Sequence, residues 1–123
     1  MTNKPQTARR RGAATEQLAA RWLEERGLTL VSANYQVKGG ELDLIMRDGD
    51  TLVFVEVKHR ATTRGGHPLE TITPQKQRRL IRAASLYLAR TAVSTPCRFD
   101  ILAITGHPPA LEFHWEKAAF DAY

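Results

Sequence analysis

Residues 41–58 constrain the fold more than any other part of the chain. They hold two strand-like runs, 41–47 and 51–58, on either side of the pair Asp48-Gly49, which is favoured in tight hairpin turns. Both runs are rich in branched apolar residues, and such residues favour strands. We therefore expect an antiparallel hairpin that belongs to a larger, buried sheet.

The segments on either side of this hairpin predict two helices and further strands. Residues 12–26 place alanine and leucine on one side at a helical period, and Gly27 supplies a stop. A second helix over 74–90 has Thr73 as its N-cap and Pro74 at its first position. Strands are expected over 28–35, 98–105 and 110–115. The prediction is one α/β domain over 1–123, with an αβββαβ core and a mixed sheet flanked by helices.

The charge balance favours a polyanionic partner. The chain has 18 Lys and Arg against 13 Asp and Glu, a formal charge of +5, and thirteen of its basic residues are arginine. The planar guanidinium matches phosphate oxygens, which points to nucleic acid; a merely soluble basic surface is the alternative. Residues 1–11 are basic and have too little apolar surface to offset the entropy of ordering them, so we expect a loose basic arm there.

Composition also excludes several classes of protein. Cys97 is the only cysteine, which rules out an intramolecular disulfide and a thiolate-rich zinc cluster, and we expect it to pack in the core. The amino-terminal stretch lacks the apolar run of a signal peptide, and no window is long and apolar enough to cross a membrane. A cytoplasmic protein with no membrane partner is expected.

Charged side chains gather at one end of the hairpin. Side chains alternate between the faces of a strand, so Glu56 and Lys58 share a face of the second run. In the first run, Glu41, Asp43 and Ile45 are expected on one face, and Leu42, Leu44 and Met46 on the other. These positions make Asp43, Glu56 and Lys58 the first candidates for chemistry.

The register of the hairpin decides whether Asp43 and Glu56 meet, because directly opposed residues in an antiparallel ladder point the same way. A two-residue turn leaves Asp43 diagonal to Glu56, and a four-residue loop sets the two opposite each other. A three-residue loop would place them on opposite faces of the sheet. The first two alternatives both allow a shared site.

Two adjacent carboxylates repel unless positive charge neutralises them, and Lys58 supplies only one such charge. Carboxylate oxygens are hard ligands that suit Mg²⁺ or Mn²⁺. A bound metal would polarise a phosphate, lower the pKa of a water nucleophile and orient both, which predicts phosphodiester hydrolysis. The alternative is a half-exposed strand on which Glu56 and Lys58 simply face solvent.

Two further charged residues interrupt the apolar stripes of the helices. A carboxylate in the middle of the first stripe needs a partner, so Glu16 either joins the acidic cluster or stays hydrated at the rim as an early-helix acid. Lys76, in the first turn of the second helix, either contacts a phosphate or extends as an ordinary surface lysine. Both alternatives stay open for each residue.

Several motifs occur together in a recognisable order. They are GAATEQLAARWL over 12–23, GELDLI from Gly40, VFVEVKHR from Val53, KQRRLIRAASLYL from Lys76 and RFDILAI from Arg98. In these motifs the chain resembles the YraN family of bacterial proteins. The fold of that family is similar to the restriction-endonuclease-like PD-(D/E)xK superfamily, which includes the archaeal Holliday-junction resolvases.

The resemblance implies roles for particular residues. The superfamily's metal-binding aspartate falls on Asp43, its Glu-x-Lys pair on Glu56 and Lys58, and the first-helix acid of the resolvases on Glu16. Asp43 and Glu56 would hold the metal, Lys58 would orient water or stabilise developing charge, and Glu16 would tune the site. Basic residues after the hairpin and on the second helix would hold backbone phosphates without reading sequence: Arg60, Arg64, Lys76, Arg78 and Arg82.

The expected function is thus that of a Mg²⁺-dependent endonuclease acting on DNA, including branched or otherwise unusual structures. The alternative is a binding module of the same fold that holds nucleic acid, or another protein, without cutting; a third class is a structural subunit of a larger assembly. By analogy with the resolvases, a homodimer is expected.

Overall fold

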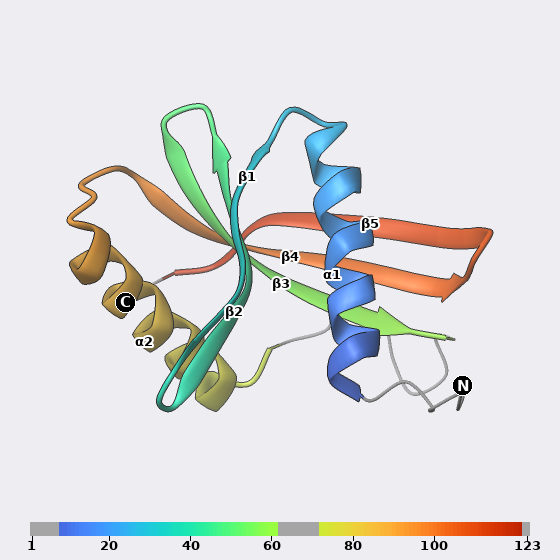
Figure 1. Cartoon of the computed structure of the whole chain (residues 1–123), viewed down its shortest axis with the longest axis horizontal. Helices are drawn as coiled ribbons and strands as arrows, with labels where there is room; N and C mark the ends of the chain where they lie inside the picture. Colours follow the sequence, from blue (N-terminus) through green and yellow to red (C-terminus); the bar gives the residue numbers. More distant parts are fainter. Residues whose placement is uncertain (1–7, 62–71, 122–123) are drawn as a thin grey trace, which may run out of the picture.

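The computed structural model describes residues 8–61 and 72–121 (Figure 1). Its elements follow in the order α1 (Ala8–Glu24), β1 (Thr29–Val37), β2 (Gly40–Asp48), β3 (Thr51–Arg60), α2 (Pro74–Thr91), β4 (Cys97–His107) and β5 (Ala110–Phe120). The predicted α/β fold with an αβββαβ core is confirmed. Both strands expected after α2, over 98–105 and 110–115, are present as β4 and β5.

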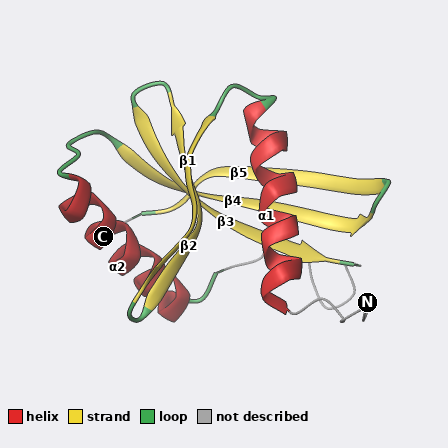
Figure 2. Cartoon of the chain, in the orientation of Figure 1, coloured by secondary structure: helices red, strands yellow, loops and turns green. Residues whose placement is uncertain are grey.

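The strands form one mixed sheet in the order β1-β2-β3-β4-β5. Neighbouring strands are antiparallel except β3 and β4, which run parallel because α2 carries the chain back across the sheet between them. Figure 2 shows the two helices well apart from each other, on either side of the strands. The sheet is therefore the middle layer of the molecule.

Each helix covers its own apolar cluster. The α1 cluster is formed by Ala19, Ala20, Leu23, Leu28, Leu44, Met46, Val53, Val55, Leu102 and Ile104. The α2 cluster is formed by Leu42, Ile45, Leu52, Phe54, Ile72, Leu80, Ala83, Ala84, Phe99 and Ile101. Successive residues of β3 alternate between the two clusters, as the strand period requires. Both faces of β3 are thereby buried.

Three local expectations were wrong. The amino-terminal helix begins at Ala8, inside the stretch 1–11 expected to be loose, and residues 1–7 lie outside the described part of the chain. The strand β3 continues to Arg60, two residues beyond the predicted run 51–58. Cys97 is exposed at the start of β4 rather than packed in the core.

The β2–β3 turn lies one residue later than expected. Asp48 pairs with Thr51, so Gly49 and Asp50 form the turn, with Gly49 at a φ of 60°. A positive φ at this position is the conformation that glycine adopts without strain, so the glycine takes the first place in the turn. This shift sets the register on which the site depends.

Candidate active site at the end of the β2–β3 ladder

The β2–β3 ladder ends at the pair Leu44–Val55. Continuing this register by one residue sets Asp43 opposite Glu56. This is the pairing expected from a four-residue loop, although the turn itself has two residues, Gly49 and Asp50. Beyond the pair Leu44–Val55, a side-chain acceptor takes the place of a backbone carbonyl: the Val57 N–H donates a hydrogen bond to Asp43 Oδ2 at 2.9 Å. Asp43 is therefore held at the place where the two strands separate.

The face alternation of β2 breaks at the same place. Leu42 packs in the α2 cluster together with Ile45, whereas Leu44 packs in the α1 cluster. The expectation that Leu42 and Leu44 share a face was wrong. This irregularity places the Asp43 carboxyl group between the two helical layers, within reach of charged residues from both.

Glu56 is a buried acid with only 8% of its surface exposed. Lys76 from the first turn of α2 reaches it, with Nζ at 3.3 Å from Glu56 Oε1. Thr73 begins that helix, and its hydroxyl oxygen accepts from the Lys76 N–H at 3.1 Å. The predicted N-cap is thus confirmed, and it fixes the turn that carries the lysine.

Glu16 of α1 faces the same group from the other layer. Its carboxyl group is within hydrogen-bonding reach of Asp43. The two acids line a cleft of about 190 Å³ together with Thr15, Val57 and His59. Of the two alternatives for Glu16, the structure favours the one in which it belongs to the acidic cluster.

The three acids bind protons more tightly than exposed carboxyl groups do. Burial, and then the neighbouring Asp43 carboxylate, raise the pKa of Glu56 to about 7, against the lowering effect of Lys76. Burial, and then Asp43, raise the pKa of Glu16 to about 7. Burial also raises the pKa of Asp43, although the hydrogen bond from Val57 N–H opposes this. Such shifts cluster at functional sites, but structural networks produce them too.

Within 8–61 and 72–121, no group of three or more His, Cys, Asp or Glu side chains forms a ready-made metal cluster. Mg²⁺ commonly keeps several waters and uses only one or two carboxylates of the protein, so the pair Asp43 and Glu56 fits its chemistry. Lys58 lies two residues after Glu56 on the same strand, half-buried. Lys76 lowers the pKa of both Asp43 and Glu56.

The expected phosphate-binding residues occupy different places. Arg60 is exposed at the end of β3, and Arg78 is exposed on α2. The Arg82 side chain ties α2 to the β1–β2 hairpin, because its Nε donates to the Lys38 carbonyl at 3.1 Å. Arg64 lies outside the described residues.

Asp100 is a fully buried acid that the sequence did not single out. It accepts from Arg98 Nε at 3.0 Å, from Trp115 Nε1 at 3.0 Å and from the Ala118 N–H at 3.0 Å. Arg98 also binds Asp48 at 2.9 Å. These bonds join β2, β4 and β5, so Asp100 holds the sheet together.

Comparison of the sequence with known proteins places the chain in a family. The profile of the uncharacterised protein family UPF0102 matches residues 15–104. The chain belongs to the UPF0102 family. A UPF0102 protein of Chromohalobacter salexigens is 56% identical over the full length of both chains. One of Nitrosococcus oceani is 48% identical, covering 95% of this chain and 96% of the relative.

The UPF0102 protein YraN of Salmonella arizonae is 46% identical, covering 94% of this chain and 87% of its own length. The resemblance to YraN proteins is therefore confirmed. The stretch that matches the UPF0102 profile begins one residue before Glu16 and includes Asp43, Glu56, Lys58 and Lys76. In the described part of this UPF0102 chain, no helix is long and apolar enough to cross a membrane.

Proposed function

We propose that this protein is a divalent-metal-dependent nuclease that hydrolyses phosphodiester bonds in DNA. One observation carries the proposal: Asp43 and Glu56 meet where β2 and β3 separate, while Lys76 faces Glu56 at 3.3 Å. A buried carboxylate and a half-buried one beside a cation form a site that attracts positive charge and offers hard oxygen ligands.

Asp43 and Glu56 would hold Mg²⁺ or Mn²⁺. When bound, the metal would polarise the phosphate and lower the pKa of a water molecule. The Val57 N–H, which donates to Asp43 Oδ2, already orients this carboxylate. Both acids must lose their protons before a metal binds, so metal affinity rises as the pH rises through 7.

The surrounding residues have distinct parts in the proposed site. Lys58 follows Glu56 on the same face of β3 and would stabilise charge that develops on the phosphate. Lys76 neutralises Glu56 in the free protein. Glu16 faces Asp43 and would adjust the charge of the site, because each ionised acid increases the attraction for a cation.

The motif order supports the restriction-endonuclease-like reading of this site. Asp43 and the pair Glu56 and Lys58 stand at the positions that match the PD-(D/E)xK pattern. The αβββαβ core is of the kind expected for that superfamily, and resemblance to Holliday-junction resolvases suggests branched DNA as a substrate and a homodimer as the working form. Exposed Arg60 and Arg78 would hold backbone phosphates beside the site.

The test is incubation with 5′-labelled linear and four-way-junction DNA, with Mg²⁺, Mn²⁺ or EDTA. The wild-type protein is expected to cut only with metal, and Asp43→Asn and Glu56→Gln are expected to lower the rate by at least about 100-fold, typical of losing a group that stabilises the transition state. Asp121→Asn, at an exposed position after β5, is the matched control. DNA binding with a steep salt dependence but no metal-dependent product would support the non-cutting module instead.

A further inference from the structure

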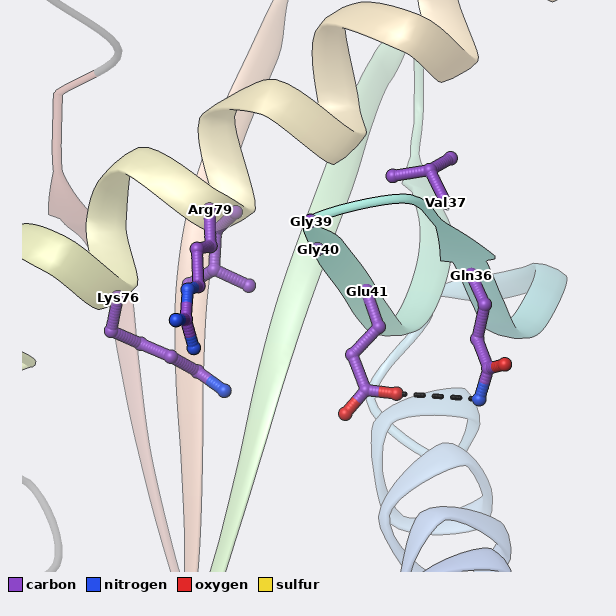
Figure 3. Close-up of a pocket in the computed structure, with 8 residues that line it drawn as sticks. Gln36, Val37, Gly39, Gly40, Glu41, Lys76 and Arg79 are labelled. Atoms are coloured by element: carbon purple, nitrogen blue, oxygen red, sulfur yellow. Dashed lines mark hydrogen bonds between the residues drawn. The ribbon is translucent and has the colours of Figure 1, made fainter.

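A polar pocket of about 360 Å³ opens between α2 and the β1–β2 hairpin. Figure 3 shows Lys76 and Arg79 extending from the helix and Gln36 and Glu41 from the hairpin, with their polar ends toward the same opening. Lys76 also contacts Glu56 of the acidic site at 3.3 Å. The pocket and the acidic site are therefore neighbours that share one side chain.

The helical wall of the pocket suits a phosphate. Lys76 and Arg79 are three residues apart, so they project from the same side of α2. Arg79 is exposed, and its guanidinium offers several donors in a plane that matches phosphate oxygens. The proposed nuclease site assigns no role to Arg79.

The hairpin wall has the opposite chemistry. Gln36 and Glu41 are cross-strand partners, and the Gln36 amide donates to Glu41 Oε2 at 3.5 Å. The other carboxylate oxygen of Glu41 and the amide oxygen of Gln36 remain as acceptors on this wall. A bare phosphate would be repelled by Glu41, whereas the N–H groups of a nucleobase would be accepted there.

The base of the pocket is formed where the hairpin approaches the helix most closely. A Cβ atom on Gly40 would lie 2.5 Å from the Arg79 carbonyl oxygen, so only glycine allows this approach. Gly39 precedes it with a φ of 86°, a conformation that also favours glycine. The glycine pair keeps the two walls near enough for one ligand to touch both.

We infer that this pocket binds one unpaired nucleotide, with its phosphate on Lys76 and Arg79 and its base edge on Gln36 and Glu41. The volume lies in the range of small-molecule sites, and the two walls match the two ends of a nucleotide. A base already paired in a duplex cannot offer its hydrogen-bonding edge to Glu41. As a nuclease, the protein would recognise an unpaired nucleotide next to the phosphodiester bond that it hydrolyses. This part of the inference rests on the proposed nuclease function.

The test is titration with each of the four deoxynucleoside monophosphates, and separately with inorganic phosphate, in EDTA, followed by amide chemical shifts. We expect the nucleotides to shift the Gly39, Gly40 and Glu41 amides at millimolar concentration. Arg79→Ala should weaken nucleotide binding by about tenfold, the loss expected for a charge-assisted hydrogen bond. Arg21→Ala, an exposed arginine of α1 outside the pocket, should leave the affinity unchanged.

Glu41→Ala distinguishes a nucleotide site from a phosphate site. It should weaken nucleotide binding and strengthen phosphate binding, because it removes both the base acceptor and the repelling charge. Stronger binding of both probes, or shifts equal for nucleotide and phosphate, would overturn the proposal, as would shifts confined to other regions. The titration needs neither metal nor cutting, so its failure leaves the nuclease test unaffected, and failure of the nuclease test leaves the pocket standing.

Discussion

Glu56 shows how one residue's surroundings control its chemistry. A glutamate is ordinarily exposed and ionised, yet only 8% of the surface of Glu56 is exposed and its pKa is about 7. The alternation of β3 predicts its face, and the motif predicts its partner Asp43. Its contact with Lys76 was not predicted, because the two residues are brought together only by the packing of α2.

The raised pKa of Glu56 predicts how stability changes with pH. The group binds its proton more tightly in the folded state, with a pKa of about 7 against 4.5, so folding stability falls as the pH rises from 4.5 through 7. One such group contributes a slope of at most about 1.4 kcal/mol per pH unit. Thermal unfolding at pH 5 and pH 8 in EDTA measures it.

Glu56→Gln removes the titrating carboxyl group, so comparing this variant with the wild type isolates the contribution of Glu56 to the pH dependence of stability. The variant should lose less stability than the wild type between pH 5 and pH 8, because the amide stays neutral at both values. Equal losses in the two proteins would show that Glu56 is not protonated in the folded state near neutral pH.

The buried contacts of Asp100 predict that replacing this residue lowers the free energy of unfolding strongly, although Asp100 is not one of the three site acids. Asp100→Ala would leave Arg98, Trp115 Nε1 and the Ala118 N–H without their buried acceptor. Removing one partner of a buried ionic group costs about 3–5 kcal/mol of the free energy of unfolding. Urea denaturation checks this, with Asp121→Ala at an exposed position as the control, expected to stay within about 0.5 kcal/mol. Equal stability of the two variants would contradict the role assigned to Asp100.

At the scale of the elements, the hairpin was predicted well and its details less well. Two strands around an Asp-Gly pair follow from local preferences. The observed register, with Asp43 opposite Glu56, is one of the two predicted registers that allow a shared site. The turn formed one residue later, because Gly49 occupies the place that needs a positive φ. The break in alternation between Leu42 and Leu44 could not be predicted from a strict period of two, since it arises where the strands separate.

The contact of the β1–β2 hairpin with α2 predicts that Gly40 has no substitute. In Gly40→Ala, the new methyl group would lie 2.5 Å from the Arg79 carbonyl oxygen, so the hairpin or the helix must move. Steric strain of this kind in a packed region costs about 1–3 kcal/mol of the free energy of unfolding. The midpoint of urea denaturation measures the cost.

Gly27→Ala provides a contrast, because an added Cβ there meets nothing within 4 Å although φ is 99°. The Gly27 variant should be destabilised by backbone strain alone and should keep the amide shifts of the β1–β2 hairpin. Gly40→Ala should change those shifts. An unchanged hairpin spectrum and denaturation midpoint in Gly40→Ala would contradict the close approach.

At the scale of the whole molecule, the two helices complete the site from opposite layers. α1 brings Glu16 to Asp43, and α2 brings Lys76 to Glu56, while β2 and β3 supply the two central acids. The order of elements was predictable from periodicity and caps, and it was confirmed. The pocket around Arg79 was not predictable, because its two walls are about 40 residues apart in the chain and meet only through the fold.

The central claim is that Asp43 and Glu56 form a divalent-metal site, and calorimetric titration with Mn²⁺ and Mg²⁺ at pH 8 tests it most directly. The wild-type protein and Asp121→Asn should bind metal at millimolar concentration or tighter. Asp43→Asn and Glu56→Gln should each lose at least about tenfold in affinity, since each removes one of the few hard ligands. No binding by the wild type, or equal binding by all four proteins, would contradict the claim.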